Sequence, residues 1–269
     1  MEAVKALAVL SRFTSQQWGL VTTAQANDAG IDRVTLLRLS EATLLRPVRR
    51  GVYAAESAPP SPLHEIQAVW LSLNPPTPAW ERTGLDLAGG VVSHVSATQV
   101  HGVGDLVADA VELTVPRRRT SRDPAVRLRF PRQRPLAVDD IALVDGLPVT
   151  SLARTVVDLL DTHTDGSHLA EVIRDGVESG LLDLATLTPR IGGYARRYGL
   201  RSQAGEQLIE HLLDQIGSSI TSLAWRFPAQ RTAGETVATA RSLASALASD
   251  PELRGALAEH LTTWRTESS

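Results

Sequence analysis

The segment from Gly19 to Tyr53 constrains the fold of this chain more than any other part of the sequence. Two short helical patterns lie on either side of Gly30, and a hairpin pattern with several arginines follows from Leu44 to Ala54. Helix, turn, helix and hairpin in this order form a compact unit that can place one helix in the major groove of a duplex. The segment therefore predicts a winged helix-turn-helix that binds DNA.

The helices of this unit carry recognisable start signals. Thr22 and Gln25 have the spacing of a capping box, and Asp32 is placed to cap the following helix. In that following helix we expect one apolar side to face the core, formed by Ile31, Val34 and Leu37. A preceding helix over residues 3–17 should pack beneath the unit through Val4, Leu7, Ala8 and Leu10.

Arginine is suited to DNA recognition because its planar fork can bond a guanine edge at two points or hold a phosphate. Arg33 and Arg38, on the outward side of the second helix, are the candidates for contacts to base edges. The other candidates lie at a helix start or on the wing, where a phosphate or the minor groove would lie. The predicted DNA-binding residues are Thr22, Thr23, Arg33, Thr35, Arg38, Arg46, Arg49 and Arg50. The alternative is that these arginines form a solvated surface, or that the winged helix contacts protein.

Composition narrows the remaining possibilities. Apolar residues make up 43% and charged residues 21%, a balance typical of folded globular proteins. No apolar run approaches the roughly 18 residues needed to span a bilayer, so we expect a cytoplasmic protein without a membrane partner. The absence of cysteine excludes disulfides, thiol nucleophiles and thiolate-bound clusters, and Lys5 is the only lysine available to any chemistry.

The rest of the chain divides into a mixed part and a helical part. Glu56–Pro62 is interpreted as a linker because its prolines disfavour helix, and a helix is expected over residues 63–73. Strands are expected over Val91–Val95, Ala110–Val115, Val126–Phe130, Ile141–Val144 and Leu147–Val149. Helices are expected near 151–161, 167–180, 183–198, 203–216, 234–249 and 251–265. The predicted fold is α+β and helix-rich, with a winged helix-turn-helix at 1–55, a mixed α/β domain at 63–165 and a helical extension at 166–269 packed on it.

The densest charge lies in residues 116–135, with eight arginines and one acidic residue. Its first cluster is Arg117, Arg118, Arg119 and Arg122. Two interpretations remain open. The cluster can extend a DNA footprint or bind an acidic protein surface or RNA. It can equally be a solvated loop that leads into the outer face of a strand, because apolar residues and arginines alternate over residues 126–130.

Several stretches resemble the AbiEi family, the antitoxins of type IV toxin-antitoxin systems. They are Leu45-Arg46-Pro47-Val48-Arg49-Arg50-Gly51-Val52-Tyr53, Val91-Val92-Ser93-His94-Val95-Ser96-Ala97-Thr98-Gln99-Val100-His101-Gly102, Val111-Glu112-Leu113-Thr114-Val115-Pro116 and Leu147-Pro148-Val149-Thr150-Ser151-Leu152-Ala153-Arg154-Thr155-Val156-Val157-Asp158. The resemblance implies that the first domain represses a shared operon by binding inverted repeats in its own promoter. It also implies a cognate nucleotidyltransferase-type toxin, which an AbiEi-like second domain opposes directly or indirectly.

Other polar residues suggest chemistry only weakly. Ser93, His94 and His101 could form a catalytic or metal site, but no acidic third ligand lies at a suitable spacing, so we interpret the histidines as structural. Asp158, Asp161 and Asp165 are interpreted as a solvated helix end. We therefore predict no catalytic residue, no metal ion, no cofactor and no enzymatic activity.

Two alternatives to a DNA-binding antitoxin remain. Residues 200–210 faintly resemble the opening of a restriction-like nuclease domain, although residues 211–269 show neither strands nor a lysine for its metal-dependent chemistry. The helical tail could instead bind a small molecule, which would make the protein a ligand-sensing regulator.

Overall fold

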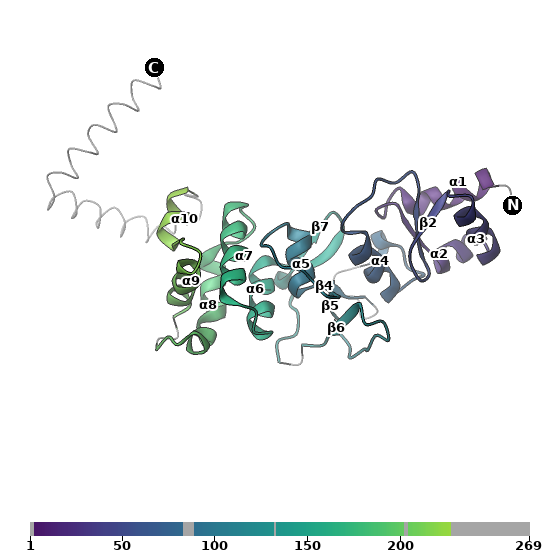
Figure 1. The fold of residues 1–269 in the computed structure, drawn as a ribbon. Helices are drawn as coiled ribbons and strands as arrows, with labels where there is room; N and C mark the ends of the chain where they lie inside the picture. The colour runs from purple at the N-terminus through teal and green to yellow at the C-terminus, as the bar shows by residue number, and fades with distance from the viewer. Residues whose placement is uncertain (1–2, 83–88, 132, 202–203, 227–269) are drawn as a thin grey trace, which may run out of the picture. The chain divides into compact units, whose positions relative to one another are not determined.

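The structure, a computed structural model, describes residues 3–82, 89–131, 133–201 and 204–226 (Figure 1). Among the described residues, those up to residue 220 belong to one compact unit. The described residues form an α+β fold in which helices predominate, as expected from the sequence. The helices predicted at 234–249 and 251–265 lie outside the described residues.

The first part of the fold is a winged helix-turn-helix. Its elements are α1 (Ala3–Thr14), β1 (Leu20–Thr22), α2 (Thr23–Asp28), α3 (Arg33–Glu41), β2 (Leu45–Arg49) and β3 (Val52–Ala55). The strands form an antiparallel sheet in the order β1-β3-β2, so β3 lies at its centre. The predicted hairpin is thus confirmed, with β1 as an additional strand.

Local signals in the sequence set the bounds of α2 and α3. The capping box of Thr22 and Gln25 is formed in full at the start of α2. Gly30 has a φ of +80°, which side chains other than glycine rarely adopt, and it turns the chain between the two helices. Asp32 then caps α3, because its carboxylate accepts a hydrogen bond of 2.7 Å from the Thr35 amide.

The core of this unit corrects the predicted orientation of α3 and part of the prediction for α1. In α1 the buried residues are Ala6, Leu10 and Phe13, whereas Val4 is 78% exposed and Ala8 is exposed. In α3 the buried residues are Leu36 and Leu39, while Val34 and Leu37 are each 55% exposed. Of the three residues predicted to face the core here, only Ile31 does so. Helix α3 is thus rotated from its predicted orientation. In α1 the predicted Leu10 is buried and Leu7 packs against the core, whereas Ala6 and Phe13 take the places expected for Val4 and Ala8.

Helix α4 (His64–Leu73) joins two layers of the fold. It is buried over most of its length, and Trp70 at its centre is 1% exposed. One apolar cluster contains Leu20 and Val52 of the first sheet, Trp70, and Leu113 of the second sheet. The apolar core therefore continues across the predicted linker at 56–62, and the division into domains at 1–55, 63–165 and 166–269 stays a prediction.

The second sheet follows η1 (Ala79–Glu81) and has the strand order β6-β5-β4-β8-β7. Its strands are β4 (Val91–Val92), β5 (Val111–Thr114), β6 (Val126–Arg129), β7 (Ile141–Val144) and β8 (Leu147–Thr150). The β5-β6 and β4-β8 pairs are parallel and the other two pairs are antiparallel. The predicted strands all form, but the first ends at Val92 and the chain turns into α5 (His94–His101).

Helices cover the remainder of the described chain. They are α6 (Leu152–Asp161), α7 (Gly166–Glu178), α8 (Leu184–Ile191), η3 (Gly192–Tyr198), α9 (Gly205–Asp214) and α10 (Ile220–Arg226), after the short η2 (Val138–Asp140). The helix predicted at 183–198 changes to a 3₁₀-helix at Gly192. Helix α6 packs against both α5 and α7, which links the second sheet to the helical part.

Candidate nucleic-acid interface

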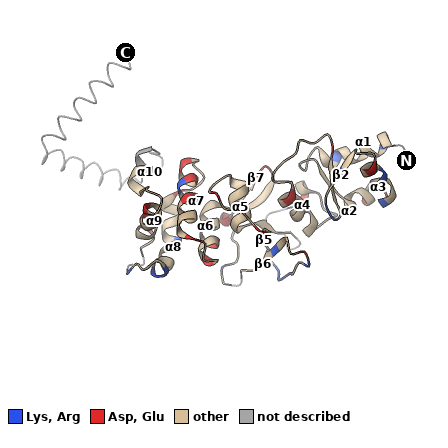
Figure 2. Ribbon diagram, in the orientation of Figure 1, with Lys and Arg blue, Asp and Glu red and all other residues tan. Residues whose placement is uncertain are grey.

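Helix α3 has an exposed face that combines charge with apolar surface. Burial of Leu36 and Leu39 leaves the opposite side to solvent, and that side carries Arg33, Val34, Leu37 and Arg38. We call these four residues the α3 face. Basic residues are visible on α3 and on the neighbouring hairpin in Figure 2. Hydrogen bonds from Thr35 hold the pKa of Asp32 below its ordinary value, so the cap at the start of the helix stays ionised.

The chemistry of the α3 face fits the edges of base pairs. An arginine fork matches the two acceptors of guanine in the major groove, and aliphatic groups pack on the thymine methyl. Val34 and Leu37 are apolar residues that remain exposed to solvent, and they are neighbours on the helix because they lie three positions apart. Neighbouring exposed apolar side chains are typical of a contact surface. Thr35, which is half-buried, lies beside this face.

The wing presents two of its three predicted arginines. A bulge between Pro47 and Arg49 interrupts the hairpin register, and bulges re-aim side chains. Arg46 and Arg50 are exposed. Arg49 turns back into the protein and donates to Glu65 at 2.9 Å and to Asp123 at 2.8 Å, so that its side chain is only 13% exposed. Its charge is already matched by two carboxylates, which argues against the predicted DNA contact.

The start of α2 does not offer the phosphate site that the sequence suggested. Thr22 is fully buried, and its hydroxyl donates to the carbonyl oxygen of Pro75 at 2.6 Å. The Thr23 amide donates to the carbonyl of Gly51 in the wing turn, and the Gln25 amide donates to Thr22. The turn of the wing thus closes this helix end, and Thr22 is removed from the candidate contacts. Thr23 is half-buried beside it.

With this geometry established, the segment can be compared with known families. Residues 9–55 match a family model described as transcriptional regulator, AbiEi antitoxin. This part of the chain is AbiEi-like. The matched residues run from α1 to the end of β3 and include the α3 face and the wing. The family resemblance deduced from the sequence is thus confirmed for this segment, while that of residues 91–158 stays a prediction.

Comparisons of the whole chain add little to the AbiEi match. No curated protein matches the sequence. One solved structure, the RV2827C protein from Mycobacterium tuberculosis, is similar with a TM-score of 0.46 and 16% sequence identity, over 85% of this chain and 82% of that chain. A similarity this distant carries no argument about function.

The basic cluster beyond the AbiEi-like segment is divided between exposed and bound side chains. Arg117, Arg118 and Arg122 are exposed, and we call these three the basic arm. Arg119 is half-buried and donates to the carbonyl of Leu73 at the end of α4, at 3.1 Å. Because Arg122 precedes Asp123, the partner of Arg49, the arm ends beside the wing.

The arginines of β6 face a single carboxylate. Arg127 and Arg129 both donate to Glu112, at 3.2 Å and 2.6 Å, and Glu112 is 4% exposed. Burial alone would raise the pKa of Glu112, but the hydrogen bond and charge of Arg129, the charge of His94 and the hydrogen bond from the Val95 amide together leave that pKa below its ordinary value. These two arginines thus stabilise a buried anion.

Of the two histidines of α5, His94 is buried and His101 is half-buried. His94 begins the helix beside the Ser93 hydroxyl at 2.9 Å, and His101 ends it and donates to the carbonyl of Thr150 at 2.8 Å. Burial lowers the pKa of both histidines. His94 therefore lies in a helix and not in the strand predicted over Val91–Val95, because the strand ends at Val92 and α5 begins at His94.

The expected solvated carboxylates include a buried one. Asp158 is 4% exposed and accepts a 2.8 Å hydrogen bond from Arg154, which also donates to Asp140 at 2.9 Å. Burial raises the pKa of Asp158. Asp161 and Asp165 are exposed, as predicted.

Among the described residues, no helix has the length and apolar character required to cross a membrane.

Proposed function

We propose that this protein is a transcriptional repressor of its own operon and the antitoxin of a type IV toxin-antitoxin pair. The observation that carries the proposal is the α3 face. It places two arginines and two aliphatic side chains on the exposed side of the helix in a segment that matches antitoxin regulators. In this proposal the protein acts in the cytoplasm by binding, without a catalytic step of its own.

The proposed complex places α3 in the major groove. Arg33 and Arg38 bond guanine edges, and Val34 and Leu37 contact thymine methyl groups. Arg46 and Arg50 hold phosphates or the minor groove on one side, with Thr23 and Thr35 at the margin. Two copies on an inverted repeat would each occupy one half-site, since the symmetry of the operator mirrors that of the bound protein.

The basic arm is proposed to extend this footprint. Its position favours DNA over a separate protein surface, because the ion pair between Arg49 and Asp123 fixes the end of the arm beside the wing. Arg117, Arg118 and Arg122 would then meet phosphates beyond those held by the wing. Arg119 serves to anchor the arm on α4.

The antitoxin half of the proposal rests on the resemblance of residues 91–158 to AbiEi proteins. These residues form the second sheet, α5 and most of α6, and this part would oppose a nucleotidyltransferase-type toxin. Co-expression of the full chain with the toxin encoded beside it should restore growth. Persistent growth arrest, with both proteins produced, would remove this half of the proposal.

The repressor half is tested by fluorescence anisotropy with the duplex immediately upstream of the coding sequence. At about 0.15 M salt we expect it to bind at least about 10³-fold more tightly than a shuffled duplex. Replacing both Arg33 and Arg38 by alanine should abolish this preference, whereas Arg196→Ala, an exposed arginine on η3, should not. Equal affinity of the wild type for the two duplexes would contradict the proposal.

One observation favours ligand sensing as a second candidate. A groove of about 550 Å³ lies where the winged unit meets α4, and Trp18, His64 and Gln67 are among its lining residues. A ligand there would contact both parts. Thermal-shift screening with nucleosides and sugars tests this, and a hit must also change DNA affinity. The structure offers no support for the nuclease alternative. Residues 205–214 form helix α9, and within the described residues no strand follows β8 that could carry the metal-binding residues of such a nuclease.

A further inference from the structure

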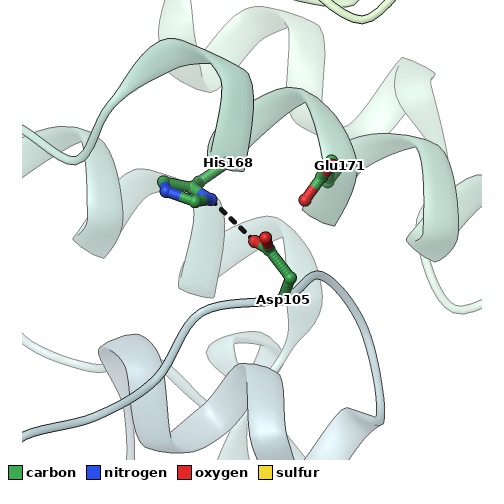
Figure 3. A group of neighbouring side chains, drawn as sticks. All are labelled: Asp105, His168 and Glu171. Atoms are coloured by element: carbon green, nitrogen blue, oxygen red, sulfur yellow. Dashed lines mark hydrogen bonds and ion pairs between the residues drawn. The ribbon is translucent and has the colours of Figure 1, made fainter.

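Three side chains with metal-binding atoms meet on the surface far from the α3 face in sequence. Asp105 lies in the loop after α5, and His168 and Glu171 lie three residues apart on α7, so that both occupy one side of that helix. Figure 3 shows the three side chains converging from the loop and the helix. One ligand atom from each residue lies within 4.8 Å of the other two, and His168 Nδ1 is 2.6 Å from Asp105 Oδ1.

The backbone holds these groups together independently of their own contacts. The Gly104 amide donates to the Asp175 carboxylate at 2.8 Å, which fastens the loop to α7 one turn beyond Glu171. Gly104 has a φ of +67°, and a Cβ there would lie 2.6 Å from a methyl carbon of Val172. The loop can approach the helix this closely only because residue 104 is glycine. The cluster is therefore positioned by packing as well as by its polar groups.

The cluster brings the carboxylates of Asp105 and Glu171 close together, and a positive charge between them would stabilise this arrangement. Two neighbouring carboxylates repel each other unless a proton or a cation lies between them. Arg174, on the same helix, already pairs with Asp175 at 2.8 Å.

We propose that Asp105, His168 and Glu171 bind one Zn²⁺ ion. One imidazole and two carboxylates form a nitrogen and oxygen donor set that Zn²⁺ accepts, whereas Mg²⁺ and Ca²⁺ favour oxygen ligands alone. A tetrahedral ion with bonds of about 2.0–2.1 Å separates its ligand atoms by about 3.3 Å. The observed separations, from 2.6 Å between His168 and Asp105 to at most 4.8 Å within the cluster, lie on both sides of this value. Water would complete the coordination.

The ion would fasten two parts of the protein that the sequence assigned to different domains. Asp105 lies in the predicted 63–165 domain, and the other two ligands lie in the predicted helical extension. Zinc binding here would contradict the expectation that no metal is bound. It is independent of the proposed function, because neither DNA binding nor toxin opposition requires it.

The test is a calorimetric titration of the metal-free, full-length protein with ZnCl₂, together with thermal unfolding. We expect one ion per chain and a higher melting temperature with zinc. His168→Ala, Glu171→Gln and Asp105→Asn should each weaken binding at least about tenfold, as expected when one ligand is lost. His163→Asn and Asp109→Asn change exposed residues outside the cluster and should bind as the wild type does.

Two further measurements keep the result interpretable. Circular dichroism of each metal-free variant should match that of the wild type, since these residues are at least partly exposed. Co²⁺ added in place of Zn²⁺ should give the visible absorption of a tetrahedral site in the wild type and lose it in His168→Ala. The proposal is overturned if the wild type binds no zinc, if the His168 and Glu171 variants bind as tightly as the wild type, or if Mg²⁺ binds at the cluster more tightly than Zn²⁺.

Discussion

Arg49 on the wing and Asp123 in the loop before β6 are 74 positions apart in the chain, yet their side chains meet at 2.8 Å. The same guanidinium reaches Glu65 at the start of α4. One arginine of the winged unit therefore connects the wing to two other segments. The three wing arginines look alike in the sequence but differ in the structure. Arg46 and Arg50 are exposed to solvent, whereas Arg49 forms ion pairs with Glu65 and Asp123.

Arg49→Ala should therefore affect stability more than DNA binding. Both carboxylate partners are about half exposed, so we expect a loss of about 1 kcal/mol or less in the free energy of unfolding. The salt dependence of DNA affinity should stay unchanged, because the charge of Arg49 is already matched. Urea unfolding and anisotropy at several salt concentrations measure both. If the salt slope of this variant is as flat as that of Arg46→Ala, Arg49 reaches DNA after all.

Removing Arg46 and Arg50 together should weaken DNA binding and flatten its salt dependence. Each neutralised phosphate contributes about 0.9 to the slope of log affinity against log salt, so the double alanine variant should lose roughly 1.8. Binding to specific and shuffled duplexes should weaken alike, since phosphate contacts carry no sequence information. A loss confined to the specific duplex would instead assign these residues to base recognition.

Leu36 and Leu37 provide a matched pair on α3. Leu36 is fully buried and Leu37 is 55% exposed. Leu36→Ala should lower the free energy of unfolding by about 2–5 kcal/mol. Leu37→Ala should leave stability nearly unchanged and reduce affinity for the specific duplex. The reverse pattern, in urea unfolding and in anisotropy, would restore the helix orientation first predicted from the sequence.

Arg38→Lys distinguishes base recognition from charge alone. Lysine keeps the charge but cannot make the bidentate contact of the arginine fork. We expect the preference for the specific duplex to fall by about 1–3 kcal/mol while affinity for the shuffled duplex is kept. Arg196→Lys serves as the control. An unchanged preference would place Arg38 on a phosphate.

The buried histidines predict a loss of stability in mild acid. The pKa of His94 and that of His101 lie below the ordinary value of 6.5 in the folded protein. As the pH falls below about 6.5, the unfolded chain therefore binds protons that the folded chain does not, and the free energy of unfolding decreases, by at most about 1.4 kcal/mol per histidine per pH unit. Urea unfolding at pH 7.5 and 5.5 measures this.

His94→Asn should reduce that pH dependence because it removes one titrating group, and asparagine tolerates the positive φ at this position. The exposed His163→Asn should not. An equal pH dependence in all three proteins would show that other groups cause the effect.

The sequence predicted the features that local signals encode. The caps of α2 and α3, the turn at Gly30 and the hairpin each depend on residues a few positions apart. The strands followed from short apolar runs. The orientation of α3 did not follow, because apolar residues at 31, 34, 36, 37 and 39 are compatible with more than one stripe. Packing in the core decides between them.

The site features that were missed depend on longer separations. Nothing near Arg49 in the sequence indicates that Asp123 lies beside it, and Asp105 is 63 positions from His168. Two local signals were available. Arg154 and Asp158 have the i,i+4 spacing of a helical ion pair. His168 and Glu171, three apart on a predicted helix, could have suggested a pair of metal ligands.

Helix α4 gives this arrangement its mechanical character. Its apolar residues belong to the same core as residues of both sheets. The winged unit, which is proposed to bind the operator, is thus packed through α4 onto the second sheet, which is proposed to oppose the toxin. A displacement of the winged unit would therefore be transmitted to the second sheet through α4. If the proposed function holds, a toxin bound at the second sheet is therefore expected to change the affinity of the winged unit for DNA.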